Sequence, residues 1–320
     1  MLLADRWNDY EVLDTSSGEK LERWGDYILV RPDPQVIWTT DHDHPAWKNK
    51  NAHYHRSSKG GGSWEFINLP DQWQIGYGLG GGEFNLRFNL KPFQFKHTGV
   101  FPEQAVNWEW VYKRIKIWNE TNQDLEKEKS NNSSSDGNAK QFGGDKFKVL
   151  NLFAYTGGAT LACAAAGAAV THVDASKGMV GWAKENAASS GLQDADIRYL
   201  VDDCVKLVER EIRRGNHYEG IIMDPPSYGR GPIGELWKIE EKVYDLIVLC
   251  SKLLSENASF FLINSYTTGL QPGVLKYMLD LTIKNKLGGG AAADEIGIPV
   301  SGSPGEKVLP CGASGRWSCK

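Results

Sequence analysis

The sequence predicts an α/β protein whose larger part is a doubly wound, mainly parallel sheet, preceded by a small N-terminal β-rich domain. Three observations predict this fold: short apolar runs alternate with helix-length segments after residue 147, a glycine turn follows the first run, and acidic residues follow several of the runs. Such alternation gives parallel strands joined by helices, and ligands bind at the carboxyl ends of the strands.

Residues 148–174 predict the first strand, turn, helix and second strand of this sheet. Residues 149–153 are apolar enough for a strand covered on both faces, and 156–158 turn the chain without bulky side chains. A helix over 159–166 would aim its first amides at a ligand above the turn, and 170–173 form the next strand. A cofactor site is the functional interpretation, but an ordinary strand-helix-strand unit explains the turn alone equally well.

The glycine spacing narrows the kind of cofactor. The turn after the first predicted strand reads TGGAT and lacks the G-x-G-x-x-G spacing expected for a pyrophosphate, and G-x-x-x-x-G-K-[ST] occurs nowhere, which counts against dinucleotide and nucleoside triphosphate sites. Asp174 follows the second strand, where a carboxylate can hold the two hydroxyls of a ribose. The turn and this acid together indicate a nucleotide-type cofactor.

The alternation of strands and helices continues beyond Asp174. Further helices are predicted over 178–190, 205–214 and 239–254, and further strands over 197–201, 219–223 and 258–264. Asp202 and Asp203 follow one of these strands and Asp224 follows another, so four acids fall at strand ends. Each acid alone is well explained as a helix cap, but the set favours a site.

Four stretches follow one another through this predicted sheet, and they read NLFAYTGGAT, VDAS, VDDCVKLV and IIMDPPSYG. In this order they resemble the motifs of class I S-adenosylmethionine-dependent methyltransferases, in the branch that modifies bases of large-subunit ribosomal RNA. The resemblance runs roughly from Phe93 to the C-terminus. It implies a Rossmann-like methyltransferase domain over 147–320 and S-adenosylmethionine as the cofactor.

The resemblance also implies roles for individual residues. The glycine turn would contact the methionine part of the cofactor through Phe153, Ala154, Tyr155, Thr156, Gly157 and Gly158. Asp174 would hold the ribose, with Ser176 as a further cofactor contact, and Asp203 with Asp202 would lie beside the adenine amine. The target base would be lined by Asp224, Pro225, Pro226 and Tyr228.

The chemistry of this transfer needs little beyond positioning. A sulfonium methyl group is activated by its charge, so transfer requires alignment, exclusion of water and a place for a proton, and no metal. Prolines have a fixed φ and no N–H, so Pro225 and Pro226 would hold nearby carbonyls toward an amine, while Tyr228 would stack on a base. The alternative is a proline turn that only ends a buried strand.

The cysteines bear on the target atom. Methylation of carbon 5 of a pyrimidine needs a thiolate that adds to the ring. In family members with that activity, the thiol follows the strand that reads FFLINSYTTGL in this chain, where Asn264, Ser265 and Tyr266 stand instead. A structural or incidental rather than a catalytic role is predicted for Cys163, Cys204, Cys250, Cys311 and Cys319. A nitrogen of guanine or adenine is therefore the favoured target, although similar D-P-P loops occur with other targets.

Outside the main sheet, residues 1–118 predict a β-rich domain that ends in a connecting helix, and 119–146 a polar linker or inserted loop. Short β-like segments lie at 27–30, 36–39 and 84–88, and the last hairpin of the main sheet is predicted at 295–302 and 308–317. The resemblance implies that FKHTGVFPEQAVNWEW helps to close the cofactor pocket, with Phe101 and Gln104 near the cofactor.

Composition excludes several classes of protein. A 320-residue chain with 41% hydrophobic and 24% charged residues suits a two-domain enzyme. The sequence has no signal-peptide pattern and no apolar run of about 18 residues, so no membrane protein is predicted. Its irregularly spaced cysteines suit a reducing compartment, which predicts a cytoplasmic protein, with an organelle as the alternative.

The net charge of −4 means that any RNA-binding surface must be local. Each candidate residue for such a surface, taken alone, is explained more simply as part of a charged helix face above aromatic side chains. These candidates are Lys91, Lys96, His97, Lys113, Arg114 and Lys116.

Four of the seven histidines gather in the segment DHDHPAWKNKNAHYH, at His42, His44, His53 and His55. A metal site would require their side chains to converge. A polar loop rich in Asn, Lys and Asp is the favoured interpretation, and no metal is predicted.

The sequence therefore predicts an S-adenosylmethionine-dependent methyltransferase that acts on a base of ribosomal RNA, turned out of its stack into a pocket at Asp224. Three alternatives stay open: a protein or small-molecule acceptor, a nicotinamide-dependent oxidoreductase, and a methyltransferase fold that only binds.

Overall fold

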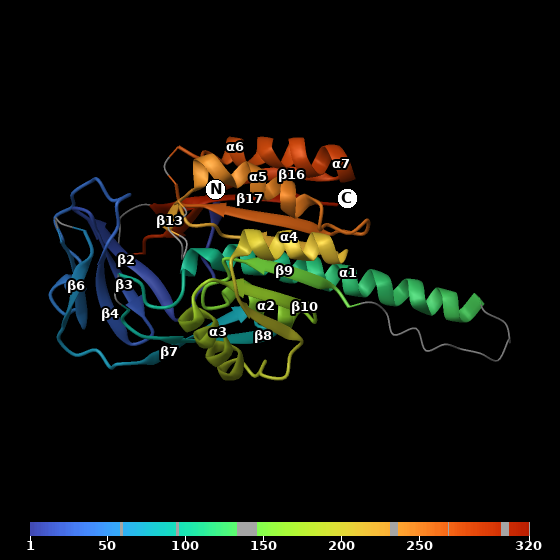
Figure 1. Cartoon of the computed structure of the whole chain (residues 1–320). Coiled ribbons are helices and arrows are strands. Elements are labelled where there is room, and N and C mark those ends of the chain that lie inside the picture. Colours follow the sequence, from blue (N-terminus) through green and yellow to red (C-terminus); the bar gives the residue numbers. More distant parts are fainter. Residues whose placement is uncertain are drawn as a thin grey trace.

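The computed structural model describes residues 1–57, 60–93, 96–132, 146–230, 236–267, 269–301 and 307–319. It has two parts, an N-terminal group of β-strands and a larger sheet with helices on both faces (Figure 1). The long helix α1 (Ala105–Asn132) begins between the two parts and projects beyond the larger one (Figure 1). No helix in these ranges is long and apolar enough to cross a membrane.

Among the described residues, the larger sheet has eight strands in the order β1-β16-β17-β15-β12-β9-β10-β11. Their bounds are Leu2–Leu3 for β1, Lys148–Leu152 for β9, Ala169–Asp174 for β10, Ile197–Val201 for β11, Gly220–Met223 for β12, Phe260–Ser265 for β15, Gly290–Pro299 for β16 and Val308–Ser318 for β17. Strand β9 pairs in parallel with β10 on one side and β12 on the other. The strand order therefore reverses between β9 and β12, where sheets of this kind bind ligands.

The predicted α/β class is confirmed, including the last hairpin, since β17 is antiparallel to both β15 and β16. Alternate residues of the strands pack on opposite faces: Val149 and Leu262 join a core with α1, α2 and α3, whereas Leu150 and Ile263 join one with α4, α5 and α6. The remaining helix bounds are Gly158–Ala165 for α2, Lys177–Ser189 for α3, Cys204–Arg214 for α4, Ile239–Ser251 for α5, Pro272–Leu279 for α6, which continues through a π-helical turn (Asp280–Lys284), and Asn285–Leu287 for α7.

The N-terminal part is β-rich, as predicted. Its main sheet has the order β2-β3-β4-β5-β6, and β7 and β8 form a separate hairpin. The bounds are Tyr10–Ser16 for β2, Glu19–Trp24 for β3, Tyr27–Pro32 for β4, Ala52–Arg56 for β5, Gly62–Phe66 for β6, Trp73–Leu79 for β7 and Phe84–Leu90 for β8. The hairpin packs on α3, where the Trp182 indole donates to the Asn89 carbonyl at 2.7 Å and Asn186 Oδ1 accepts from the Asn89 amide at 2.8 Å.

The prediction of a strand at 36–39 is wrong. The carbonyls of Val36 and Trp38 instead accept from the amides of Gly18 and Ser17, at 2.8 and 2.7 Å, in the turn between β2 and β3. These backbone carbonyls are therefore hydrogen-bonded to a turn rather than to a neighbouring strand.

Residues 119–132, predicted as part of a polar linker or loop, continue helix α1, and 133–145 lie outside the described residues. Asn119 still anchors this helix by donating to the Ala166 carbonyl at 2.9 Å. The end of this helix projects from the molecule (Figure 1). At the other end of the chain, β1 pairs with β16, so residues 2–3 belong to the larger sheet rather than to the predicted N-terminal domain.

Candidate active site

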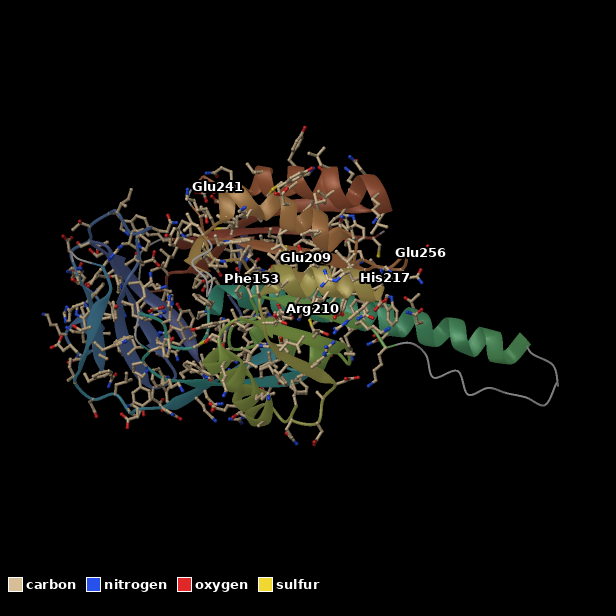
Figure 2. All side chains as sticks on the ribbon, viewed as in Figure 1. Phe153, Glu209, Arg210, His217, Glu241 and Glu256 are labelled. Carbon is tan, nitrogen blue, oxygen red and sulfur yellow. The ribbon has the colours of Figure 1, made fainter. Side chains whose placement is uncertain are left out.

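A cavity of about 890 Å³ opens at the carboxyl ends of β9, β10, β11 and β12. Asp174, Asp202, Asp203 and Asp224 all line it, so the structure brings the four predicted acids together. Phe153, which follows β9, lies at the end of the sheet that faces the N-terminal strands, whereas His217 lies at the opposite end (Figure 2). A cavity of this volume can hold a nucleoside cofactor.

The glycine turn lies directly after β9, and three of its residues have positive φ values. Phe153 and Tyr155 have φ values of 56° and 50°, in the left-handed region that non-glycine residues rarely adopt, and Gly157 has a φ of 92°. Both aromatic residues line the large cavity and a smaller one of about 50 Å³ beside it, which is also lined by Ala154, Thr156 and Gly158. Gly157 lines neither cavity but precedes α2 as its N-cap residue. The turn thus presents backbone and the start of a helix to the cavity.

Asp174 ends β10 and is fixed by the turn. Its carboxylate accepts from the Tyr155 amide at 2.9 Å and from the Ser176 amide at 2.8 Å. Burial raises the pKa of Asp174, and these two amides act in the opposite direction. A carboxylate offers about four acceptor positions, so two remain for hydroxyl groups of a ligand.

Asp202 and Asp203 end β11 and contribute to the start of α4. Asp202 accepts from the Asp203 amide at 2.9 Å and forms an ion pair with Arg210. Asp203 is the N-cap residue of α4 and accepts from the Lys206 amide at 2.9 Å. The cap explanation is therefore correct for Asp203, and the same side chain also lines the cavity.

Asp224 follows β12 and lines both cavities. Burial of this carboxyl, together with the negative charge of Glu103, raises its pKa to about 7. Pro225 and Pro226 also line the large cavity, but the Pro226 carbonyl already accepts from the Trp237 indole at 2.6 Å. One acceptor position of the Pro226 carbonyl is thus used within the protein.

Tyr228 does not line either cavity and is 55% exposed. The cause is the short hairpin of β13 (Tyr228–Arg230) and β14 (Leu236–Lys238), in which Gly229 pairs with Trp237. Side chains alternate between the two faces of a strand, so Gly229 and Trp237 face the cavity and Tyr228 faces away. The Trp237 ring lines the large cavity and lies 5.8 Å from that of Phe153.

The segment 96–104 forms one wall of the cavity and is held by the N-terminal sheet. Arg31 of β4 donates to the Lys96 carbonyl at 2.8 Å, while Glu22 of β3 accepts from the same guanidinium at 2.6 and 2.8 Å. The next residue, His97, lines the large cavity, and burial with the nearby cations lowers its pKa to about 4. The His97 ring is therefore neutral at physiological pH.

Phe101 and Gln104 both lie in this wall. Phe101 lines both cavities, and its ring centroid lies 5.2 Å from that of Tyr155 and 6.0 Å from that of Tyr266. Gln104 lines the small cavity, donates to the Tyr266 hydroxyl at 2.6 Å and accepts from the Asn107 amide group at 2.9 Å. The Gln104 side chain thus fixes the wall as well as facing the cavity.

Trp237 and Tyr266 line the cavity but were not predicted from the sequence to do so. His97 also lines it, although the sequence predicted this residue on an RNA-binding surface. Tyr266 directly follows β15, so the rule that ligands lie at strand ends would have found it. Trp237 carried only a weak signal, an aromatic residue just before a predicted helix.

The predicted basic surface is largely engaged within the protein. Lys96 donates to the Pro32 carbonyl at 3.0 Å, and Lys91 lies 4.4 Å from the ring of Trp182. Arg114 donates to the Ser259 carbonyl at 3.2 Å. Among the six candidates, only His97 lines the acidic cavity, so the cavity itself favours a positively charged ligand over a phosphate.

The sheet order, with one antiparallel strand and an acidic cavity at its reversal point, is that of a nucleoside-binding α/β protein, and the comparisons with known proteins name the family. The chain belongs to the S-adenosylmethionine-dependent methyltransferases. The family model described as S-adenosylmethionine-dependent methyltransferase matches residues 138–259. A solved methyltransferase of this kind from Agrobacterium tumefaciens is 34% identical, with 100% of this chain and 93% of that one covered and a TM-score of 0.84.

Two further relatives add detail. The ribosomal RNA large subunit methyltransferase K/L of Shewanella frigidimarina is 33% identical over 150 residues, which are 45% of this chain and 20% of that protein. The matched segment thus spans about a fifth of that relative. A methyltransferase solved in complex with S-adenosylhomocysteine shares the fold at 18% identity and a TM-score of 0.65, with 98% of this chain and 76% of that one covered. The cofactor is S-adenosylmethionine, which excludes the alternative of a nicotinamide-dependent oxidoreductase.

Proposed function

We propose that this protein transfers a methyl group from S-adenosylmethionine to a nitrogen of a base in RNA, with ribosomal RNA as the substrate. The observation that carries this proposal is the environment of Asp224. Its carboxyl lies in a cavity that is also lined by the glycine turn and by aromatic side chains, and its pKa is raised to about 7. The cofactor, when bound, supplies a methyl group on a positively charged sulfur. The attacking amine must then lose a proton, and Asp224 is placed to receive it.

The cofactor is proposed to lie along the predicted residues of the glycine turn and of the ends of β10 and β11. Asp174 has acceptor positions left for the ribose hydroxyls, and Asp203 with Asp202 lines the part of the cavity beside α4. Four carboxyl groups around this space also favour the positive sulfonium over neutral analogues. Ser176, the N-cap residue of α3, completes this side of the cavity.

The acceptor is proposed to be a base turned out of its stack. Phe101, Trp237 and Tyr266 line the cavity around Asp224, and aromatic faces bind bases by stacking. The name of the Shewanella relative, a ribosomal RNA methyltransferase, favours RNA among nucleic acids. The overall charge of −4 requires that the RNA be held by this pocket and a local surface rather than by a broad basic face.

A nitrogen target is proposed over carbon 5 because Cys204 is the only cysteine among the described residues that line either cavity, and its thiol is unsuited to attack a ring. Cys204 lines the cavity, but burial raises the pKa of its thiol to about 12. Cys163 and Cys250 are also buried. A thiol that stays protonated cannot add to a pyrimidine ring.

The proposal is tested with the purified protein and S-adenosylmethionine that carries a labelled methyl group. Deproteinised ribosomal RNA, total protein and small-molecule extracts serve as separate acceptors, and RNA is digested to nucleosides. We expect the label on an amine of a purine nucleoside, with loss of at least about a hundredfold in Asp224→Asn. Asp245→Asn, which removes an exposed carboxylate from α5, is the matched control and should transfer normally. Label in protein or in a small molecule, or a fully active Asp224→Asn, would overturn the proposal.

A further inference from the structure

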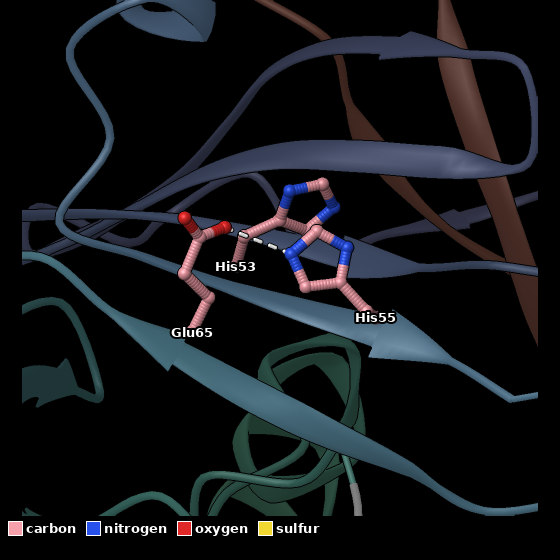
Figure 3. A group of neighbouring side chains, drawn as sticks. All are labelled: His53, His55 and Glu65. Carbon is pink, nitrogen blue, oxygen red and sulfur yellow. Dashed lines mark hydrogen bonds and ion pairs between the residues drawn. The ribbon is translucent and has the colours of Figure 1, made fainter.

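Two histidines and a glutamate converge on the N-terminal sheet, on elements that do not line the cavity described above. His53 and His55 belong to β5 and Glu65 to β6, and their side chains point toward one another (Figure 3). The prediction that this histidine-rich segment is a polar loop is therefore wrong for these two residues, whereas His42 and His44 do lie outside strands.

The sheet geometry explains why these side chains meet. Residues two apart on a strand point to the same face, which places His53 beside His55, with ring centroids 4.0 Å apart. Strand β6 is antiparallel to β5, and its Glu65 pairs in register with His53. The Glu65 carboxylate lies 2.8 Å from Nε2 of His55 (Figure 3).

These groups have the chemistry of a zinc site. Each of the three offers one ligand atom, and the three atoms all lie within 4.8 Å of one another. Zinc bonds of about 2.0–2.1 Å to nitrogen and oxygen place tetrahedral ligands about 3.3 Å apart. The side chains of His55 and Glu65 are 52% and 53% exposed, so small rotations of these two side chains can close the difference.

A fourth residue is placed to orient the cluster. Glu19 of β3 lies 2.6 Å from Nε2 of His53, whose side chain is only 14% exposed. If a metal binds through Nδ1 of His53, the Nε2–H can keep its bond to Glu19. A carboxylate that accepts from the distal nitrogen of a metal-bound imidazole is the usual support of histidine ligands.

We propose that His53, His55 and Glu65 bind a zinc ion, with Glu19 orienting His53 and a water molecule completing the tetrahedron. The ion would join β5 to β6, the last strand of its sheet, and would thereby stabilise the folded N-terminal part. The site is separate from the candidate active site, since none of its residues lines either cavity there.

The test uses the full chain without an affinity tag, freed of metal by a chelator and titrated with zinc in a calorimeter. We expect one zinc per chain, and a midpoint of thermal unfolding that rises with zinc. His55→Gln and Glu65→Gln should each weaken binding by at least about tenfold and remove the thermal shift, and Glu19→Gln should weaken it by about 10- to 100-fold.

The matched control is His217→Gln, which removes an exposed histidine from the other end of the molecule and should bind zinc as the wild type does. Circular dichroism without zinc checks that each variant folds. A stoichiometry well below one, or equal zinc affinity in wild type, His55→Gln and Glu65→Gln, would overturn the proposal.

Discussion

Asp174 and Asp224 end two strands of one sheet but have different surroundings, and these surroundings suit different tasks. Backbone amides of Tyr155 and Ser176 donate to Asp174 and fix the orientation of its carboxylate. Asp224 is half-buried, and desolvation of its carboxyl together with the negative charge of Glu103 raises its pKa to about 7. The first carboxylate is suited to hold hydroxyl groups, and the second to take up a proton near neutral pH.

For Asp174→Asn we expect weaker binding of S-adenosylmethionine, measured by calorimetry. The amide group cannot accept hydrogen bonds on both sides, so at least one bond to a charged acceptor is lost, which costs about 1.5–3 kcal/mol. This corresponds to about a 10- to 150-fold higher Kd. Asp196→Asn, which removes only an exposed ion pair with Lys146, is the control. An unchanged Kd in Asp174→Asn would refute the ribose role of this residue.

Asp224 predicts a specific pH dependence of methyl transfer. Because its pKa is raised to about 7, the carboxyl is protonated below that pH and cannot accept a proton. The rate at saturating cofactor should therefore rise between about pH 6 and 8 and level off above, whereas Asp224→Asn should be slow and flat over that range. A wild-type rate that does not change between pH 6 and 8 would speak against this proton acceptor.

At the scale of elements, the junction between the N-terminal sheet and α1 builds one wall of the cavity. The buried pair of Glu22 and Arg31 holds the carbonyl of Lys96, and Gln104 at the end of the same segment bonds to Tyr266 after β15. The position of this wall thus depends on packing well away from the cavity.

Glu22→Gln should destabilise the protein strongly. It leaves the buried guanidinium of Arg31 without its carboxylate, which costs about 3–5 kcal/mol in the free energy of unfolding, measured with urea. Glu11→Gln removes the same charge from the half-exposed pair with Arg23 and should cost less than about 1 kcal/mol. Similar losses in the two variants would contradict the proposed anchoring role.

Elements with strong local signals were predictable from the sequence. The predicted strand at 197–201 matches β11, the predicted helix at 178–190 is displaced by one residue from α3, and the predicted helix at 205–214 starts one residue after α4. Their apolar patterns and capping residues act over a few positions. The four acids could be placed in one site because parallel strands end at one edge of a sheet.

The features that depend on pairing over long distances in the sequence could not be predicted. The pairing of β1 with β16 places Leu2 opposite Ile296, and no local sequence pattern predicts it. Trp237 lines the cavity and Tyr228 does not because of the register of β13 with β14. A shift of one residue would turn every side chain of the strand to the other face. The convergence of His53 with Glu65 likewise follows from the register of β5 with β6.

At the scale of the whole molecule, the candidate active site is lined by residues from both parts of the chain. The larger sheet supplies the four acids and the glycine turn, and the segment leading out of the N-terminal sheet supplies His97, Phe101 and Gln104. The N-terminal strands are thus a support for one wall of the cavity as well as the proposed place of a zinc ion.

The central claim, methylation of a ribosomal RNA base that depends on Asp224, is tested most directly by nucleoside mass spectrometry of ribosomal RNA. The RNA is compared between cells with the gene, without it, and without it but supplied with the wild-type protein or with Asp224→Asn. We predict that one methylated purine disappears without the gene, returns with the wild-type protein and does not return with Asp224→Asn. An identical set of modified nucleosides in all four strains would contradict the account.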